Sequence, residues 1–363
     1  MAGKRDWLRL GGSTDQFFGM REGRLTGGKA DGMRICDVYT SAGLSMEVLP
    51  DRCMDIRRLC FKGMNLGFLS QTGPVSPALC EREGIGFLRG FTAGFLSTCG
   101  LRNVGSPCEE NGEAFGLHGR IGAMPAEAFR AETEWHGGRP ELVLHGRMRE
   151  SRLFGENLTL ARTLRVKGDG TGFEIEDVVE NEGFRPEAVM LLYHFNLGAP
   201  LLDAGARLVL PSLGIEPRDA DAAAGVAEYA RMAVPSAAYR EQVFYHDLAA
   251  DPEGWTFCAL CNEALSMGVV IRWRKDRLGR FTQWKQMGEG AYVLGLEPCN
   301  CPVSGRVRAR AEDALAWLEP GKRHRASLKV DLLVGKEALA QISQAAGTAV
   351  PGGIRRSGKT GGQ

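Results

Sequence analysis

The 363-residue chain is predicted to be mainly β, with large antiparallel sheets arranged as a sandwich or a barrel and few helices. Short runs in which apolar and polar residues alternate recur along the chain, and this is the side-chain period of a half-buried strand. Glycine and polar residues interrupt these runs, as they do at turns. The pattern contains no repeated strand and helix units of the kind that build a parallel sheet.

Seven stretches carry the β prediction. In the clearest one, Gly168, Asp169, Gly170 and Gly172 supply a turn between two alternating runs, which should pair as a hairpin. In chain order the stretches are RICDVYTSAG (34–43), SMEVLPDR (45–52), ELVLHGRMRE (141–150), LTLARTLRVKGDGTGFEIEDVVENEG (158–183), SMGVVIRWRK (266–275), AYVLGLEP (291–298) and HRASLKVDLLVG (324–335).

Helical composition is confined to EALAQISQAA (337–346) and DADAAAGVAEYARMA (219–233). A mainly β chain of this length can form one domain, so we expect a single domain over residues 1–345. Residues 346–363 are rich in glycine and small polar residues, which cannot bury enough apolar surface to order themselves. They are predicted to form a flexible tail.

The formal net charge of +1 excludes a global field that would attract nucleic acid or an acidic membrane. No stretch resembles a signal peptide or approaches the roughly 20 apolar residues of a membrane span. The glycine-rich pieces GLRNVG (100–105) and RLTGGKADG (24–32) lack the pattern of a phosphate loop. We therefore expect a cytoplasmic monomer or homodimer whose partner is a small, near-neutral molecule, with no nucleic-acid or membrane partner.

The ten cysteines are expected to be reduced thiols that pack as small hydrophobic residues. Cys258 and Cys261, together with Cys299 and Cys301, could instead supply four zinc ligands. Residues 255–260 read as a strand without a turn residue, and an extended strand would point Cys258 and Cys261 to opposite faces. The packing interpretation is therefore favoured, and no metal is expected.

Titratable residues in strand-like apolar surroundings are the candidate site residues. His118 lies between glycines in GLHGR, which lets backbone or ligand approach the imidazole. His194 follows an apolar run and could equally be a hydrogen-bonded core histidine. Glu297 precedes a proline, which places its carboxylate at the end of a strand, where sites are often built. Arg102 in STCGLRNVG is the fourth candidate.

Five stretches in order resemble the aldose 1-epimerase (galactose mutarotase-like) superfamily, and specifically its poorly characterised bacterial branch. The similarity spans roughly residues 30 to 335. The stretches are VLPDRCMDI (48–56), GFLSTCGLRNVG (94–105), GLHGRIGAMPAE (116–127), LLYHFNLG (191–198) and QWKQMGEGAYVLGLEP (283–298). The resemblance implies a β-supersandwich, and it implies that 1–345 is one galactose mutarotase-like domain.

The resemblance also implies roles. His118 falls on the family's first active-site histidine, His194 on the second, and Glu297 on the catalytic glutamate. Arg102 is the best match to the arginine that holds a sugar hydroxyl. Asp247 stands at a plausible distance before Glu297 to be the substrate-binding aspartate, although the surrounding motif does not match.

Two departures from the family pattern concern the substrate. The well-studied mutarotases place a proline between the second histidine and the phenylalanine region, whereas here Phe195 follows His194 directly. Their arginine segment before the first histidine is also spaced differently from TCGLRNVG (98–105). The sugar pocket is therefore expected to differ.

Exchanging the α and β anomers of a reducing sugar requires a base at the anomeric hydroxyl and an acid at the ring oxygen. We assign Glu297 as the base, His194 as the acid, and His118 as a second imidazole that holds or helps to protonate the ring oxygen. This chemistry needs no cofactor. Two alternatives remain at this point: a carbohydrate-binding or regulatory protein on the same fold, and an isomerase or lyase acting on a modified sugar.

Further polar residues could bind sugar hydroxyls. Arg52 and Lys285 join Arg102 in this group, although Arg52 could instead form an internal ion pair with Asp55. Trp284 could stack against the apolar face of the ring or could belong to the core. The predicted substrate-binding residues are Arg102, Arg52, Lys285, Trp284 and Asp247.

Overall fold

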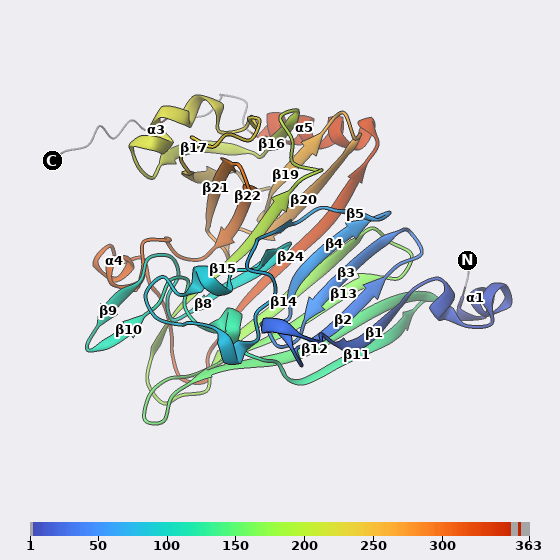
Figure 1. Ribbon diagram of the computed structural model, residues 1–363, viewed down its shortest axis with the longest axis horizontal. Helices are drawn as coiled ribbons and strands as arrows, with labels where there is room; N and C mark the ends of the chain where they lie inside the picture. The colour runs from blue at the N-terminus through green and yellow to red at the C-terminus, as the bar shows by residue number, and fades with distance from the viewer. Residues whose placement is uncertain (1–2, 350–354, 357–363) are drawn as a thin grey trace.

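A computed structural model of the chain describes residues 3–349 and 355–356. Two large sheets lie face to face as a sandwich, and the main hydrophobic core fills the space between them (Figure 1). Alternate residues of each strand point into this core, as a period of two requires. From the larger sheet they include Leu191, Tyr193 and Phe195, and from the smaller sheet Leu160, Ile175 and Leu328.

The larger sheet has 13 strands, and its main order is β1-β2-β3-β4-β8-β15-β22-β21-β18-β17-β25, with β5 beside β4 and β23 beside β15. Its strands are β1 (Gly19–Arg24), β2 (Arg34–Tyr39), β3 (Leu44–Leu49), β4 (Asp55–Phe61), β5 (Met64–Asn65), β8 (Leu96–Leu101), β15 (Glu187–Gly198), β17 (Ser212–Pro217), β18 (Gln242–Leu248), β21 (Arg280–Gly288), β22 (Ala291–Cys299), β23 (Ala316–Leu318) and β25 (Arg355–Arg356).

The smaller sheet has eight strands in the order β11-β12-β13-β14-β24-β20-β19-β16. They are β11 (Glu127–His136), β12 (Arg139–Ser151), β13 (Asn157–Lys167), β14 (Gly172–Asn181), β24 (Arg323–Val334), β20 (Met267–Arg274), β19 (Trp255–Asn262) and β16 (Ala206–Val209). Two further pairs are β6 (Phe68–Leu69) with β7 (Ala93–Gly94), and β9 (Cys108–Glu110) with β10 (Glu113–Phe115).

All seven alternating stretches contain strands, which confirms the β prediction and selects the sandwich over the barrel. The predicted hairpin is formed by β13 and β14, which pair antiparallel with Val166 opposite Phe173. Strand β19 includes the predicted strand 255–260, and its cysteines point to opposite faces. Cys258 belongs to the main core, whereas Cys261 packs in a separate cluster under the C-terminal helix.

The helices are short apart from the last one. They are α1 (Lys4–Gly11), α2 (Phe87–Gly90), α3 (Ala220–Gly225), α4 (Arg306–Ala311) and α5 (Lys336–Ala349), with single 3₁₀ turns at Thr14–Gln16, Gly28–Ala30, Pro77–Leu79, Ile121–Ala123 and Val226–Glu228. None of the helices in the described part of the chain is long and apolar enough to cross a membrane.

Helix α5 corrects the predicted boundary of the tail, because residues 346–349 are helical and not part of a flexible segment. The rest of the predicted tail lies outside the described residues, except for Arg355 and Arg356 in β25. The other helix prediction, for 219–233, is correct only for α3 and the turn after it. Beyond that turn the chain pairs with β16, since Leu208 N donates to Ala230 O at 2.9 Å.

A buried network of ion pairs and hydrogen bonds joins the two sheets next to the candidate residue His194. Arg162 in β13 donates to Asp177 of β14 at 2.7 Å, and the Tyr193 hydroxyl donates to the same carboxylate at 2.7 Å. Arg162 also donates to Asp55 of β4 at 3.2 Å, and the Thr98 hydroxyl of β8 donates to Asp55 at 2.6 Å. Because Tyr193 immediately precedes His194 in β15, this network holds that strand in place.

Candidate active site

His118 lies in a tightly held loop between β10 and β11. Its backbone has a positive φ of 59°, its N–H donates to Gly105 O at 2.9 Å, and its carbonyl accepts from Gly100 N at 3.0 Å. Gly119 has a φ of 74°, and a Cβ there would lie 2.2 Å from Gly100 O. The glycine that follows His118 is therefore needed because the loop lies directly against β8.

His194 and Glu297 meet on neighbouring strands, β15 and β22, where Phe195 stands opposite Leu296. Because Phe195 and Leu296 point into the main core, His194 and Glu297 project from the other face of the sheet. His194 Nε2 lies 3.2 Å from Glu297 Oε1, and the side chains are only 7% and 4% exposed. The imidazole and the carboxyl group are therefore in close contact on the face of the sheet that lies away from the main core.

Aromatic rings surround the two histidines. The His118 and His194 rings have centroids 5.8 Å apart. Phe87 lies 5.0 Å from the His118 ring, and Phe91 lies 5.3 Å from the His194 ring. Trp284 of β21 contacts His194 on another side, with centroids 5.4 Å apart and an interplanar angle of 80°. The structure therefore brings His118, His194, Glu297 and Trp284 together in apolar surroundings.

Burial shifts the pKa of each titratable group in this cluster. It lowers the pKa of His194 to about 3, with a further contribution from His118, and lowers the pKa of His118 to about 4. It raises the pKa of Glu297 to about 8, with Glu241 raising it further and Arg218 opposing. At neutral pH both imidazoles are therefore uncharged and the Glu297 carboxyl is mostly protonated. Such perturbed groups in contact are typical of active sites.

Glu241 and Arg218 are candidate site residues that the sequence analysis missed. Trp284 Nε1 donates to Glu241 Oε2 at 2.9 Å, and Arg218 Nη2 donates to Glu241 Oε1 at 2.8 Å. They stand just outside the ends of β18 and β17, in turns without a motif. In sequence such charges look like ordinary surface residues, and only the pairing of β18 with β21 places them beside Trp284.

Arg52 lies at the back of the site and holds its loops together. Its guanidinium donates to the carbonyls of Gly122 at 2.7 Å, Val75 at 2.9 Å and Gly90 at 3.3 Å. Arg52 and His118 line the same small cavity of about 30 Å³. The ion partner of Asp55 is Arg162, at 3.2 Å, so the alternative of an Arg52–Asp55 pair does not describe the main contact.

Arg102 lies away from this cluster. Its guanidinium is ion-paired with Glu113, Glu156 and Glu187, the last at 3.4 Å, and it lines a separate cavity of about 340 Å³. Glu187 precedes His194 by seven residues in β15, which corresponds to roughly 23 Å along a strand. The structure therefore places Arg102 in a buried ion-pair network and not beside His194.

Lys285 and Asp247 also lie apart from the histidine pair. Lys285 points to the opposite face of β21 from Trp284, and its ammonium donates to the carbonyls of Glu228 at 2.8 Å and Arg231 at 2.6 Å. Burial lowers the pKa of Lys285 to about 8. The exposed carboxylate of Asp247 pairs with Lys275 at 2.8 Å.

A cavity of about 950 Å³ flanks the site on the Glu297 side. It is lined by Arg218, Tyr245 and Thr282, and Thr282 stands opposite Glu297 in the pairing of β21 with β22. Asp247 also lines this cavity. The cavity reaches Thr282, the neighbour of Glu297 across the paired strands, but neither His194 nor Glu297 is among the described residues that line it.

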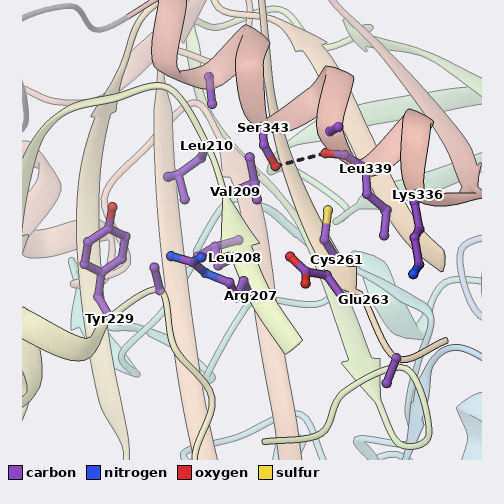
Figure 2. Close-up of a pocket in the computed structure, with 14 residues that line it drawn as sticks. Arg207, Leu208, Val209, Leu210, Tyr229, Cys261, Glu263, Lys336, Leu339 and Ser343 are labelled. Carbon is purple, nitrogen blue, oxygen red and sulfur yellow. Dashed lines mark hydrogen bonds between the residues drawn. The ribbon is translucent and has the colours of Figure 1, made fainter. Parts of the chain in front are cut away.

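Another cavity, of about 960 Å³, lies between β16 and α5 (Figure 2). Its wall combines apolar side chains such as Val209 and Leu339 with the charged groups of Arg207, Glu263 and Lys336. None of the described residues that line it is a histidine, and none belongs to the cluster around Glu297. It therefore offers no contacting acid and base comparable to His194 and Glu297.

Comparison with solved structures identifies the fold. A protein from Klebsiella pneumoniae, provisionally assigned as an aldose 1-epimerase, is 25% identical with a TM-score of 0.89, covering 96% of each chain. A galactose mutarotase-like protein from Clostridium acetobutylicum is 12% identical with a TM-score of 0.61, covering 87% of this chain and 99% of its own. The galactose 1-epimerase of Lactobacillus acidophilus is 11% identical with a TM-score of 0.55, covering 88% and 99%.

The chain thus has the galactose mutarotase-like sandwich fold, as the sequence resemblance implied. Comparison with curated protein sequences finds no match. A family model described as a domain of unknown function, DUF4432, matches residues 30–332. Since this match covers most of the chain, the protein belongs to the DUF4432 family.

Proposed function

We propose that the protein is an aldose 1-epimerase that exchanges the anomers of a reducing sugar by opening and closing its ring, without a cofactor. The observation that carries this proposal is the 3.2 Å contact between His194 Nε2 and Glu297 Oε1, with the His118 ring 5.8 Å from the His194 ring. Ring opening moves a proton from the anomeric hydroxyl to a group on the enzyme and gives another to the ring oxygen. One base and one acid in contact meet this requirement.

The His194–Glu297 pair holds one proton over a wide range of pH. With the pKa of His194 at about 3 and that of Glu297 at about 8, the pair carries two protons only in strong acid and none only above about pH 8. In the resting site the proton lies mainly on Glu297. Moving it to His194 is uphill, because the pKa of Glu297 lies above that of His194, but it creates the carboxylate base and the imidazolium acid without a change in net charge.

In the forward direction, the Glu297 carboxylate accepts the proton of the anomeric hydroxyl and the His194 imidazolium donates its proton to the ring oxygen. The opened aldehyde then rotates about the bond to its neighbouring carbon and closes again, with the two transfers reversed. The pair therefore finishes each cycle with the single proton it began with. His118 is neutral at working pH and supports the ring oxygen as a hydrogen-bonding group.

The test is the rate of anomer exchange, followed by proton NMR over a panel of reducing sugars. Glu297→Gln keeps the shape of the side chain but cannot accept a proton, and His194→Asn cannot donate one, so each should lower kcat by about 10²-fold or more. His145→Asn, which changes a histidine of β12 in the smaller sheet, is the matched control and should retain activity.

The pH profile tests the single-proton pair separately. We expect kcat/KM to be level between pH 5 and 7 and to fall as the pair loses its proton above about pH 8. A rate that instead rises through pH 8 would show that Glu297 acts as a carboxylate beside a neutral His194. If the wild type accelerates exchange of no sugar while Glu297→Gln weakens sugar binding, the protein is a carbohydrate-binding protein and the proposal is wrong.

A further inference from the structure

Trp284 reaches the site because a glycine stands opposite it. In the pairing of β21 with β22, Trp284 faces Gly295, and a Cβ at Gly295 would lie 2.9 Å from both Trp284 Cβ and Glu297 Oε1. The indole therefore occupies the space beside the Glu297 carboxylate and contacts the His194 ring. Trp284 is also partly exposed.

The orientation of the indole is set by one hydrogen bond at the rim. Trp284 Nε1 donates to Glu241 Oε2 at 2.9 Å. The other oxygen of Glu241 accepts from Arg218 at 2.8 Å, and Arg218 Nε donates to Asp219 at 2.8 Å. The carboxylate thus has one oxygen for the indole and one for the guanidinium, and its position is fixed by both.

Stability alone gives little reason for this arrangement. The side chains of Arg218 and Glu241 are 37% and 46% exposed, and exposed ion pairs contribute little to the free energy of folding. An indole N–H at a partly exposed position can also bond to water. What the Glu241 contact adds is a fixed plane for a ring that lies against the reacting groups.

We propose that Glu241 is a positioning residue that fixes the plane of Trp284, so that the indole serves as the platform against which the apolar face of the sugar stacks beside Glu297. This inference rests on the proposed function for the identity of the ligand. The contact between Glu241 and Trp284 is independent of that function. Sugars bind to aromatic platforms through their apolar C–H faces, and a platform free to rotate loses part of that contact.

The first measurement follows the indole N–H signals of ¹⁵N-labelled full-length protein by NMR. Trp284→Phe identifies the Trp284 signal as the one that disappears. We expect Glu241→Ala to shift this signal and to speed its exchange with water. Glu241→Gln should preserve it, because the amide oxygen still accepts the hydrogen bond. Asp221→Ala, which removes a neighbouring exposed carboxylate paired with Arg240, is the matched control.

The second measurement separates KM from kcat. Glu241→Ala should raise KM by about tenfold with kcat changed less than threefold, since binding is lost but the acid and base remain. Glu241→Gln should restore KM. In the background of Trp284→Ala the Glu241→Ala substitution should have no further effect on KM, because Glu241 acts through the indole.

Two results would overturn the inference. One is an unchanged Trp284 signal in Glu241→Ala, which would mean that the carboxylate does not hold the ring. The other is an equal rise in KM in the presence and absence of Trp284, which would mean that Glu241 contacts the substrate itself. If the wild type turned over no sugar, the proposed function would fail, but the NMR comparison of Glu241→Ala with Glu241→Gln would still decide the positioning role.

Discussion

Replacing Arg162 with Met tests whether the buried network beneath His194 is held by charge. Arg162 is fully buried and donates to Asp177 and Asp55, and methionine replaces its unbranched apolar stem but has no donors. The substitution leaves two buried carboxylates without their cation. Breaking a buried pair in this way costs about 3–5 kcal/mol, because the remaining charge is neither solvated nor paired.

This loss translates into a modest shift in melting temperature. The entropy of unfolding of about 2.1 cal/mol/K per residue gives roughly 0.7 kcal/mol/K for a chain of this size, so Tm should fall by about 4–7 °C. Circular dichroism during heating measures the shift. Arg165→Met is the matched control, because Arg165 lies in the same strand and pairs with Glu134 and Glu141 at a half-exposed site. Its cost should be below about 1 kcal/mol.

The pH dependence of the melting temperature is a second test of the role of Arg162. Burial raises the pKa of Asp55, and Arg162 opposes this effect, so removing Arg162 should raise that pKa further. A carboxyl whose folded-state pKa lies above its unfolded value destabilises the fold as pH rises between the two values. The Tm difference between Arg162→Met and wild type should therefore be larger at pH 8 than at pH 5. An Arg162→Met protein as stable as Arg165→Met at pH 8 would refute the reasoning.

Three further outcomes are expected. Tyr193→Phe removes the hydroxyl that donates to Asp177 and should cost about 1.5–3 kcal/mol in urea unfolding, since the acceptor is charged and buried. Gly119→Ala should lower both Tm and turnover, because the added Cβ would overlap Gly100 O and displace the loop that carries His118. Gly112→Ala, in the open turn before β10, is the control. It should lower Tm less, since only its positive φ is unfavourable there. Lys285→Met should leave KM within about twofold in the anomer-exchange assay, because the ammonium faces away from Trp284.

The strands could be predicted because their signal is local. Alternation in 158–183 sets both the faces of β13 and β14 and the turn between them, and nothing distant is needed to read it. The helix prediction for 219–233 was wrong beyond the turn at Val226–Glu228 for the opposite reason. There the backbone of Ala230 satisfies the edge strand β16, and this tertiary contact overrides helical composition.

The candidate acid and base could be identified from motifs because each lies within a short characteristic stretch. His118 lies in the loop against β8, in the stretch GLHGRIGAMPAE, and His194 and Glu297 lie in the stretches LLYHFNLG and QWKQMGEGAYVLGLEP, which resemble the family. The ion-pair partner of a buried arginine could not be predicted from such a stretch. Arg102 stands in a matching stretch, yet its guanidinium is taken up by Glu113, Glu156 and Glu187, which come from three other parts of the chain.

Lys285 and Trp284 show that neighbouring residues of one strand can belong to the candidate site and to the interior of the protein. They are adjacent in β21, so one must point toward Glu297 and the other toward the interior. Gly295 explains why Trp284 is the one that points toward Glu297, because only a residue without a side chain leaves room for an indole opposite it in β22. Gly295 stands two residues before Glu297 and therefore on the same face of β22. The stretch YVLGLE thus encodes both the proposed catalytic carboxylate and the space for its aromatic neighbour, and its glycine is as much a part of the candidate site as its glutamate.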